Sequence, residues 1–274
     1  TNTLNVFLVG DAIVEYMISK NPKIRSVNPI VGETNDGGLN DIQGRHVKMK
    51  HVLEAIKNAK SGPVKEGSVG AGTGTRALGF KGGIGTSSRV LPKKLGGYSI
   101  GVLVQSNFGN SLVVNGAPVG RELSKSSFSS SIPYDEDEGS CMIVIATDAP
   151  LSNRNLKRIA KRAIIGIGKV GGYASNGSGD YVIAFSTYKD TSSDKITSDR
   201  TSVRNNAMTS LFQATVEATE EAIINSIFMA ETISSSFGKS EELPIDETIK
   251  ILKKYNSLNW NKDCLLYTSD AADE

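Results

Sequence analysis

Apolar residues recur every three or four positions in several segments of the chain, which is the spacing of an amphipathic helix. The clearest example follows Ser152, a residue type that caps helix N-termini, and its apolar positions run from Leu156 to Ile167. In order along the chain, helices are predicted for residues 10–20, 44–59, the segment after Ser152, residues 205–233 and about 244–256.

Three shorter segments are typical of β-strands. Residues 98–105 (YSIGVLVQ) and 181–186 are two of them, and residues 141–147 (CMIVIAT) form an almost wholly apolar run. A run of that length without alternation suits a strand that is covered on both faces. Long helices mixed with apolar strands favour a layered α/β or α+β domain around a buried sheet.

Residues 121–139 do not share these patterns. Six serines lie between positions 124 and 131, and an acidic run follows at 135–138. A segment of this composition buries little apolar surface, so we expect an exposed, mobile linker. Loops rich in Gly, Asn and Asp are predicted at residues 28–41 and 171–180.

Composition narrows the classes of function. The 274 residues include 31 Lys and Arg against 29 Asp and Glu, so charge gives no argument for nucleic acid or an anionic membrane as partner. No apolar run approaches the ~20 residues that span a bilayer. The two cysteines, Cys141 and Cys264, and the two histidines, His46 and His51, lack the spacing of a metal site. A Ser-His-Asp hydrolase and a histidine-based zinc enzyme are therefore disfavoured.

Gly139 and Ser140 stand where the acidic linker ends and the apolar strand begins. A cut between them would make Ser140 a new N-terminus at the end of a central strand. Its hydroxyl can then act as nucleophile and its own α-amine as base, because an α-amine titrates near pH ~8. Glycine before the cut tolerates the strained backbone of an N-to-O acyl shift. Spacing alone favours a plain linker–strand junction, because Gly-Ser pairs are common.

Four further polar residues stand at positions that suit a site. Asn107, just after the 98–105 strand, can donate to an oxyanion. Ser178 and Asp180, two apart in a glycine-rich loop, can orient an amine or a nucleophile. Glu33, in the 28–41 loop, can pair with a substrate ammonium. On spacing alone, an ordinary turn or loop residue is the favoured interpretation of each.

Nine glycines lie between Gly62 and Gly85. A nucleotide-binding loop is one interpretation, but the segment follows no clear strand and contains no GK[ST]. A glycine-rich wall beside a binding cleft, where backbone approaches backbone or ligand, is the better one.

Five motifs together resemble one peptidase family: VNPIVGETNDGGLNDI, GSVGAGTGTRALGFKGGIGTSSR, VLVQSNFG, GSCMIVIATDAPL and NGSGDYVIAFST. Over about residues 1–258 the chain resembles the L-aminopeptidase/D-esterases and the β-peptidyl aminopeptidases. The resemblance implies an α+β fold, a four-layer αββα sandwich like that of the N-terminal-nucleophile hydrolases but with a different connectivity.

The resemblance also assigns the central roles. Autocleavage maps onto the Gly139-Ser140 bond, and Ser140 matches the nucleophile. Asn107 matches the oxyanion-hole asparagine, and Glu33 matches the carboxylate that holds the substrate's free amine.

Two departures from the family pattern concern the remaining positions. Ser178 and Asp180 match a Ser-x-acid pair near the nucleophile's amine, where some members have Glu instead of Asp. Asn35 stands where some members place an oxyanion-stabilising tyrosine, which leaves the second oxyanion donor open.

The implied activity is that of a self-processing serine aminopeptidase, which removes N-terminal residues from small peptides, amides or esters through an acyl-enzyme on Ser140. Neither a metal nor an organic cofactor is implied. The expected partner is a small peptide or amide with a free amine, without nucleic acid or membrane. Family members assemble as oligomers of αβ units, and a bacterial cytoplasmic location is expected unless a secretory signal precedes Thr1.

The organisation that follows is one domain made of two chains. Residues 1–139 are the remainder of an α chain that ends in the 121–139 linker, and residues 140–260 are the β chain. Residues 261–274 are predicted to be a non-native tail. Because family members carry a further stretch before Thr1, the chain is expected to be an N-terminally truncated fragment.

Three alternatives to the aminopeptidase remain. One is a truncated, inactive remnant of that enzyme, since missing strands would leave a sheet uncovered. Another is an acyltransferase resembling the ornithine acetyltransferases, although these use threonine where this chain has Ser140. The third is a nucleotide-binding module built on the glycine-rich segment.

Overall fold

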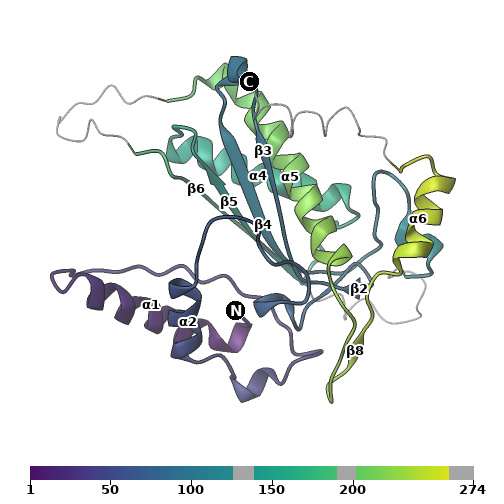
Figure 1. The fold of residues 1–274 in the computed structure, drawn as a ribbon, viewed down its shortest axis with the longest axis horizontal. Helices are drawn as coiled ribbons and strands as arrows, with labels where there is room; N and C mark the ends of the chain where they lie inside the picture. Colours follow the sequence, from purple (N-terminus) through teal and green to yellow (C-terminus); the bar gives the residue numbers. More distant parts are fainter. Residues whose placement is uncertain (126–138, 190–201, 259–274) are drawn as a thin grey trace.

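The computed structural model describes residues 1–125, 139–189 and 202–258, and its central element is a four-stranded sheet in the order β3-β4-β5-β6 (Figure 1). The strands are β3 (Ile84–Val90), β4 (Ser99–Asn107), β5 (Ser140–Thr147) and β6 (Gly179–Ser186). The pairs β3–β4 and β4–β5 are antiparallel, whereas β5 and β6 are parallel. The three predicted strands are therefore confirmed, with small shifts at their ends.

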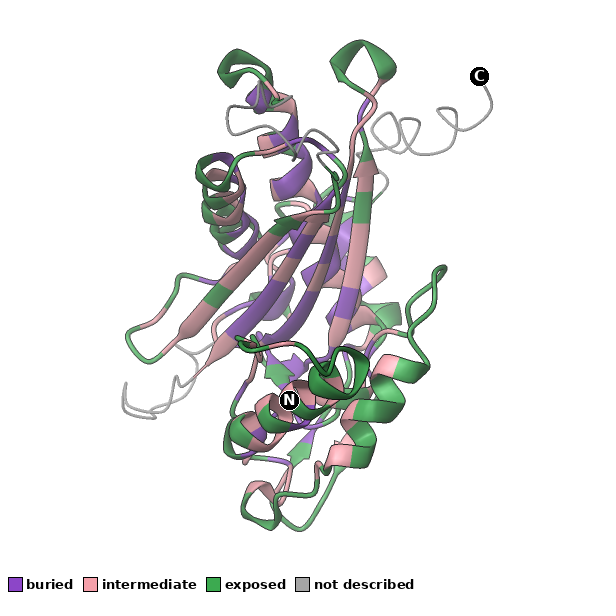
Figure 2. Ribbon diagram, turned by 90° about the vertical axis from the view of Figure 1, so that its left-hand side faces the viewer, coloured by how far each residue is buried: buried purple, intermediate pink, exposed green. Residues whose placement is uncertain are grey.

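Two helices cover one face of the sheet (Figures 1 and 2). α4 (Asn153–Lys169) connects β5 to β6, and α5 (Met208–Phe228) packs beside it against β3 and β4. Ser152 caps α4 as predicted, since its hydroxyl accepts a hydrogen bond from the Asn155 N–H at 3.4 Å. The hydrophobic core lies between this helical layer and the sheet.

The burial of β5 alternates because its two faces meet different surroundings. Cys141, Ile143 and Ile145 point towards the helices and are fully buried. Val144 on the opposite face is only half-buried, and Tyr181 of the edge strand β6 is 62% exposed. In the described residues this strand is thus fully covered on the helical side and only partly on the other, where Met142 is buried and Val144 is not. The described residues build one four-stranded sheet with one helical layer.

The first 60 residues form a separate group of elements beside one end of the sheet (Figure 1). α1 (Val6–Lys20) confirms the predicted 10–20 helix and begins earlier. α2 (Met49–Lys57), which packs on α1, is shorter than the predicted 44–59 helix. The reason is that a 3-10 turn, Ile42–Gly44, precedes Arg45 in the left-handed conformation, with φ of 47°. No right-handed helix continues through such a residue.

The part after α5 departs from its prediction. A helix is predicted to 233, but α5 ends at Phe228, because β7 (Ile233–Ser234) and β8 (Lys239–Ser240) pair as a hairpin. α6 (Ile245–Lys254) confirms the last helix. Within the described ranges, none of the helices combines the length and the apolar composition that a membrane span requires.

The predicted linker begins with an ordered turn of helix. α3 (Val119–Glu122) overlaps its first residues, and the Glu122 carboxylate accepts hydrogen bonds from Lys254 and Tyr255 at the end of α6, at 2.8 and 2.6 Å. Residues 126–138, which hold most of that linker, and the predicted tail at 261–274 lie outside the described residues.

Glycines of the 62–85 segment let backbone pack directly on backbone. A Cβ atom added to Gly85 in β3 would stand 1.9 Å from the Ala222 carbonyl oxygen of α5 and 2.5 Å from the Ser226 nitrogen. One added to Gly83 would stand 2.4 Å from the Gly67 carbonyl oxygen. The glycines therefore bring α5 and the sheet to a separation that no larger residue permits.

Close to them, one lysine is completely buried. β1 (Arg76–Ala77) and β2 (Phe80–Lys81) form a small hairpin, and the Lys81 side chain has no exposed surface. Its Nζ donates hydrogen bonds of 2.7 Å to the carbonyl oxygens of Gly72 and Gly82. Burial, with a smaller contribution from the Arg76 charge, lowers the pKa of Lys81 from 10.5 to about 8.

We expect Gly85→Ala to lower the free energy of unfolding by at least about 2 kcal/mol, because the new methyl group collides with the backbone of α5. Gly101→Ala in the neighbouring strand β4 is the matched control, since a Cβ there meets nothing within 4 Å. Urea unfolding of both variants measures the difference. Equal stabilities would contradict the packing described for α5.

The buried Lys81 predicts that stability rises with alkaline pH. The folded chain loses the Lys81 proton near pH 8, while the unfolded chain keeps it to about 10.5. Between these values the unfolded state binds more protons, so the free energy of unfolding increases, at most by ~1.4 kcal/mol per pH unit. The measurement is urea unfolding at pH 7, 8, 9 and 10, comparing wild type with Lys81→Met. A difference between the two that stays constant with pH would contradict the lowered pKa.

Candidate functional site

Three neighbouring strands begin or finish at the same end of the sheet, and each carries a residue that the sequence analysis singles out there. Ser140, the first residue of β5, lies in register between Asn107, the last of β4, and Gly179, the first of β6. Neighbouring strands are about 4.8 Å apart, so these residues are direct neighbours. Ser140 and Asn107 share the open face, because side chains alternate along each strand and Cys141 faces the helices.

The Asn107 amide is held from both sides. Its Oδ1 accepts a hydrogen bond from the Arg76 N–H at 3.0 Å, and its Nδ2 donates to the Asn35 carbonyl oxygen at 2.9 Å. An amide nitrogen carries two hydrogens. The contact with Asn35 uses one of them, which leaves the second for an oxyanion beside Ser140.

Asn35 itself takes a different place from the one expected of an oxyanion donor. Its Oδ1 accepts a hydrogen bond from the Gly37 N–H at 3.0 Å, so the side chain is turned back on its own loop. What reaches Asn107 is the backbone carbonyl of Asn35. The contacts therefore give Asn35 a role in fixing Asn107.

Ser178 and Asp180 are joined, as their spacing suggests. The Ser178 hydroxyl donates to Oδ2 of Asp180 at 2.9 Å. Asp180 pairs in register with Cys141, next to the nucleophile candidate. Burial raises the pKa of the Asp180 carboxyl, and the hydrogen bond from Ser178 opposes this shift. Its Oδ1 is buried and has no hydrogen-bond partner among the described residues.

Gly139 is fixed in the same row. Its carbonyl oxygen accepts a hydrogen bond from the Gly179 N–H at 2.9 Å. A Cβ atom at position 139 would stand 2.7 Å from Cα of Phe108 and 3.1 Å from the Asn107 carbonyl oxygen. The position therefore requires glycine for reasons of space, and the carbonyl that precedes Ser140 is already polarised by a backbone donor.

The loop that carries Glu33 crosses the open face close to this row. Thr34 accepts a hydrogen bond from Nε2 of Gln105 at 2.7 Å, and Gly32 lies against the Met142 side chain. Gln105 and Met142 are paired with each other and stand two positions from Asn107 and Ser140 on the same face. Glu33 is thus carried to the Ser140 end of the sheet, where its carboxylate accepts a hydrogen bond from Thr3.

Two basic residues of this region are not anticipated by the sequence. The Arg76 backbone orients Asn107, and its Nη2 donates to the Gly38 carbonyl oxygen at 2.8 Å and to that of Lys239 at 3.5 Å. Lys81 lies in the same hairpin. A basic residue within a run of glycines and apolar residues is the only signal that the sequence offers for either, and it does not say what the residue contacts.

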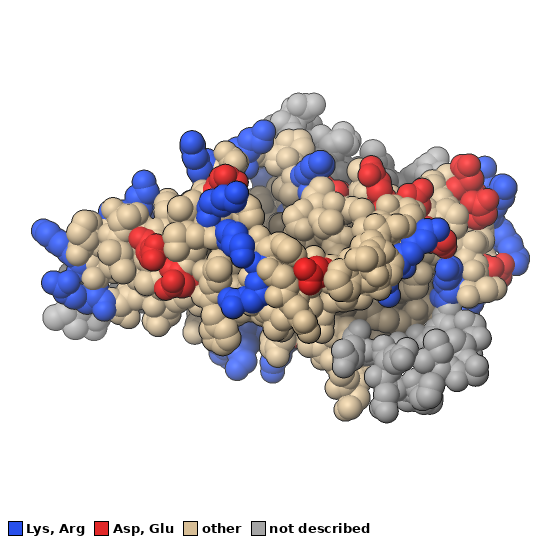
Figure 3. Space-filling model, turned by 90° about the horizontal axis from the view of Figure 1, so that it is seen from below, with Lys and Arg blue, Asp and Glu red and all other residues tan. Residues whose placement is uncertain are grey.

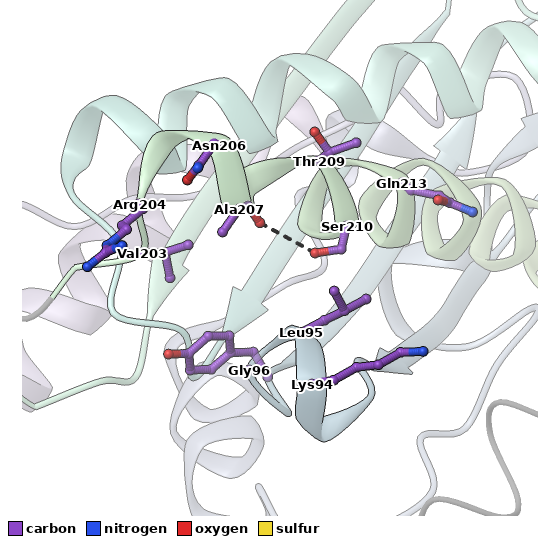
Figure 4. A pocket seen from close by; sticks show the side chains of 11 residues that line it. Lys94, Leu95, Gly96, Val203, Arg204, Asn206, Ala207, Thr209, Ser210 and Gln213 are labelled. Carbon is purple, nitrogen blue, oxygen red and sulfur yellow. Dashed lines mark hydrogen bonds between the residues drawn. The ribbon is translucent and has the colours of Figure 1, made fainter.

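A cavity of about 550 Å³ lies at the opposite end of the sheet (Figure 4). It lies between Lys94 and Leu95 in the β3–β4 turn and Thr209, Ser210 and Gln213 at the start of α5. Because β4 runs from this end towards Asn107, the cavity is a full strand length away from Ser140. Its size alone therefore does not make it the reaction site.

The charged side chains give no continuous field of one sign on the face seen in Figure 3. Lys and Arg lie among Asp and Glu there, in keeping with the formal net charge of +2.

Comparison with known proteins identifies the family of the chain. The model of "Peptidase family S58" matches residues 1–240. The β-peptidyl aminopeptidase BapA of Sphingosinicella microcystinivorans is 43% identical, over 94% of this chain and 69% of that protein. The β-aminopeptidase of a Burkholderia species superposes with a TM-score of 0.82 at 39% identity, covering 93% of this chain and 72% of that one.

A third relative bears on the fold. The L-aminopeptidase D-Ala-esterase/amidase of Ochrobactrum anthropi, described as a prototype of the serine aminopeptidases and a variant of the Ntn hydrolase fold, has a TM-score of 0.83 at 35% identity. The alignment covers 94% of this chain and 73% of that structure. The α+β fold expected from the sequence is therefore confirmed as that Ntn-hydrolase variant, and the chain belongs to peptidase family S58.

Proposed function

We propose that this chain is a self-processing serine aminopeptidase, in which Ser140 becomes the nucleophile after the chain is cut behind Gly139. The observation that carries the proposal is the row Asn107, Ser140 and Gly179, which brings together residues from three separate motifs. The relatives named as aminopeptidases support the reaction class.

The contacts around Gly139 suit the first step, which is self-cleavage. The Ser140 hydroxyl oxygen attacks the Gly139 carbonyl carbon, the carbon–nitrogen bond breaks, and the nitrogen of Ser140 takes up the proton. The Gly179 N–H stabilises the oxygen of that carbonyl as charge develops on it. Water then hydrolyses the resulting ester, which leaves a carboxylate on Gly139 and a free hydroxyl and amine on Ser140.

The same groups serve the reaction with substrate. The Ser140 hydroxyl attacks the carbonyl carbon of the N-terminal residue of a small peptide, amide or ester, and the hydroxyl proton passes to the Ser140 amine. The remaining Asn107 N–H donates to the oxyanion. The leaving amine or alcohol takes the proton, and water releases the acyl group from Ser140 in a second, equivalent attack.

Two acidic residues have separate roles in this scheme. Glu33 pairs with the free ammonium of the substrate, because its loop crosses the open face beside Ser140. Ser178 and Asp180 orient the amine of Ser140 from β6, because Ser178 directly precedes Gly179, the register partner of Ser140, and its hydroxyl holds the Asp180 carboxylate. The assembly of αβ units into oligomers and a cytoplasmic location remain predictions of the family resemblance.

A nucleotide-binding module has less support. The glycines at 67, 72, 83 and 85 stand against backbone atoms of the chain itself, within 3 Å of where a Cβ would lie. They are used in packing and do not form a cradle for phosphate. An acyltransferase would share the same geometry, and release of the acyl group to water rather than to a second amine distinguishes the two.

We expect the expressed chain to separate into two pieces of nearly equal size on a denaturing gel. Ser140→Ala should remain one band and show no aminopeptidase activity, since neither acyl shift nor acyl-enzyme can form. Ser61→Ala, which changes an exposed serine outside the site, is the control and should behave as wild type. A wild-type chain that stays intact yet hydrolyses aminoacyl amides would contradict self-processing. Cleavage in Ser140→Ala would contradict the nucleophile.

Glu33→Gln should raise KM for aminoacyl amides about tenfold or more and lower kcat less, because it removes a charge that holds the substrate in ground and transition state alike. Glu54→Gln, on the exposed surface of α2, is the matched control. Steady-state kinetics with an aminoacyl amide and its N-acetyl analogue measure the effect. An unchanged preference for the free amine in Glu33→Gln would show that another group binds the ammonium.

A further inference from the structure

Lys81 is a buried cation for which the mechanism above has no use. Its side chain has no exposed surface, and no ion pair with a carboxylate forms among the described residues. Lysine is almost never fully buried unless it is paired, because the charge loses its hydration. An apolar side chain of similar length would fill the same volume without that penalty. The hydrogen bonds of the ammonium therefore need an explanation.

These hydrogen bonds close a loop of the glycine-rich segment. The Lys81 Nζ holds the carbonyl oxygens of Gly72 and Gly82, each at 2.7 Å. The Thr75 hydroxyl donates to the same Gly72 oxygen at 3.0 Å, and the Gly82 N–H donates to the Thr75 carbonyl at 3.1 Å. The ammonium thus ties the two ends of the 72–82 segment together around Thr75.

The residue that follows Thr75 is the one that orients Asn107. The Arg76 N–H donates to Asn107 Oδ1, and this bond, together with the one from Nδ2 to the Asn35 carbonyl oxygen, fixes which way the amide points. The backbone around Arg76 is closely packed. A Cβ added to Gly82 would stand 3.0 Å from the Arg76 carbonyl carbon and 2.6 Å from the Ser106 carbonyl oxygen. A shift of the 72–82 segment therefore moves the Arg76 N–H away from Asn107.

We propose that Lys81 is a positioning residue for the oxyanion donor, because its ammonium fixes the 72–82 segment and thereby the Arg76 N–H that orients the Asn107 amide. The inference rests on the proposed function, since Asn107 is an oxyanion donor only where Ser140 is the nucleophile. Lys81 reaches the reaction through Arg76 and Asn107 and needs no contact with substrate.

The test is a double-mutant cycle between Lys81→Met and Asn107→Ala. For each variant, kcat and KM are measured on an aminoacyl amide, and kcat is expressed per mole of cleaved enzyme, which a denaturing gel quantifies. We expect Asn107→Ala to lower kcat by about 10²-fold and Lys81→Met by about tenfold, with KM changed by less than about twofold. In the double variant, kcat should equal that of Asn107→Ala alone, because the orienting contact has nothing left to orient.

Two further variants make the outcome decisive. Lys81→Gln keeps donor hydrogens without the buried charge, and its kcat should lie between those of wild type and Lys81→Met; it also serves if the Met variant does not fold. Lys157→Met, which removes an exposed ammonium on α4 away from this network, is the control and should leave kcat unchanged.

The failures of the two hypotheses are distinguishable. If the effects of Lys81→Met and Asn107→Ala multiply, or if Lys81→Met raises only KM, Lys81 does not act through Asn107 and the inference is overturned. The same holds if Lys81→Met and Lys81→Gln both keep the wild-type kcat while Asn107→Ala loses it. If Ser140→Ala and Asn107→Ala are fully active, the proposed function itself is wrong.

Discussion

The register of β5 between β4 and β6 is the constraint on which the site depends. Ser140 is flanked by Asn107 on an antiparallel neighbour and by Gly179 on a parallel one, so both sides of its backbone are paired. A shift of one residue in either ladder would turn Ser140 towards the helices and bring Cys141 to the open face. The full burial of Cys141, Ile143 and Ile145 under α4 and α5 opposes such a shift, because it would move these apolar side chains out of the core. Packing on the helical face of the sheet thus determines which side chains of β5 lie on the open face.

Much of the fold is predictable from local pattern, and the exceptions have local causes. The strands and the helices α1, α4 and α6 follow from their apolar periodicity and, for α4, from the cap at Ser152. The predicted helix at 44–59 starts late because Arg45 is left-handed, and the one at 205–233 ends early because β7 pairs with a strand that lies further along the chain. Neither cause leaves a mark in the hydrophobic pattern. Long-range pairing and special backbone angles are what periodicity does not report.

The residues of the candidate site also fall into those that the sequence predicts and those that it does not. Ser140, Asn107, Ser178, Asp180 and Glu33 stand at strand ends or in marked loops, so their positions could be predicted. The register pairs Ser140 with Asn107 and places Ser178 and Asp180 on either side of its other partner, Gly179. The contacts of Asn35 could not, because its residue type does not reveal that its carbonyl rather than its amide meets Asn107. Arg76 and Lys81 are invisible to sequence reasoning for a related reason. Each acts through backbone groups of residues whose neighbourhood exists only in the folded chain.

The position of Ser140 within one continuous sheet has a consequence for how the cut molecule would unfold and refold. A cut before Ser140 divides the chain between β4 and β5, two strands that are hydrogen-bonded along eight paired positions. The pieces would therefore stay together as one core, and dilution would not separate them while the fold persists. Refolding after denaturation would change in kind, because a process within one chain would become the meeting of two, with a rate that depends on concentration. Folding should therefore precede the cut. The cut form would stay folded because it unfolds slowly, and not because it refolds easily.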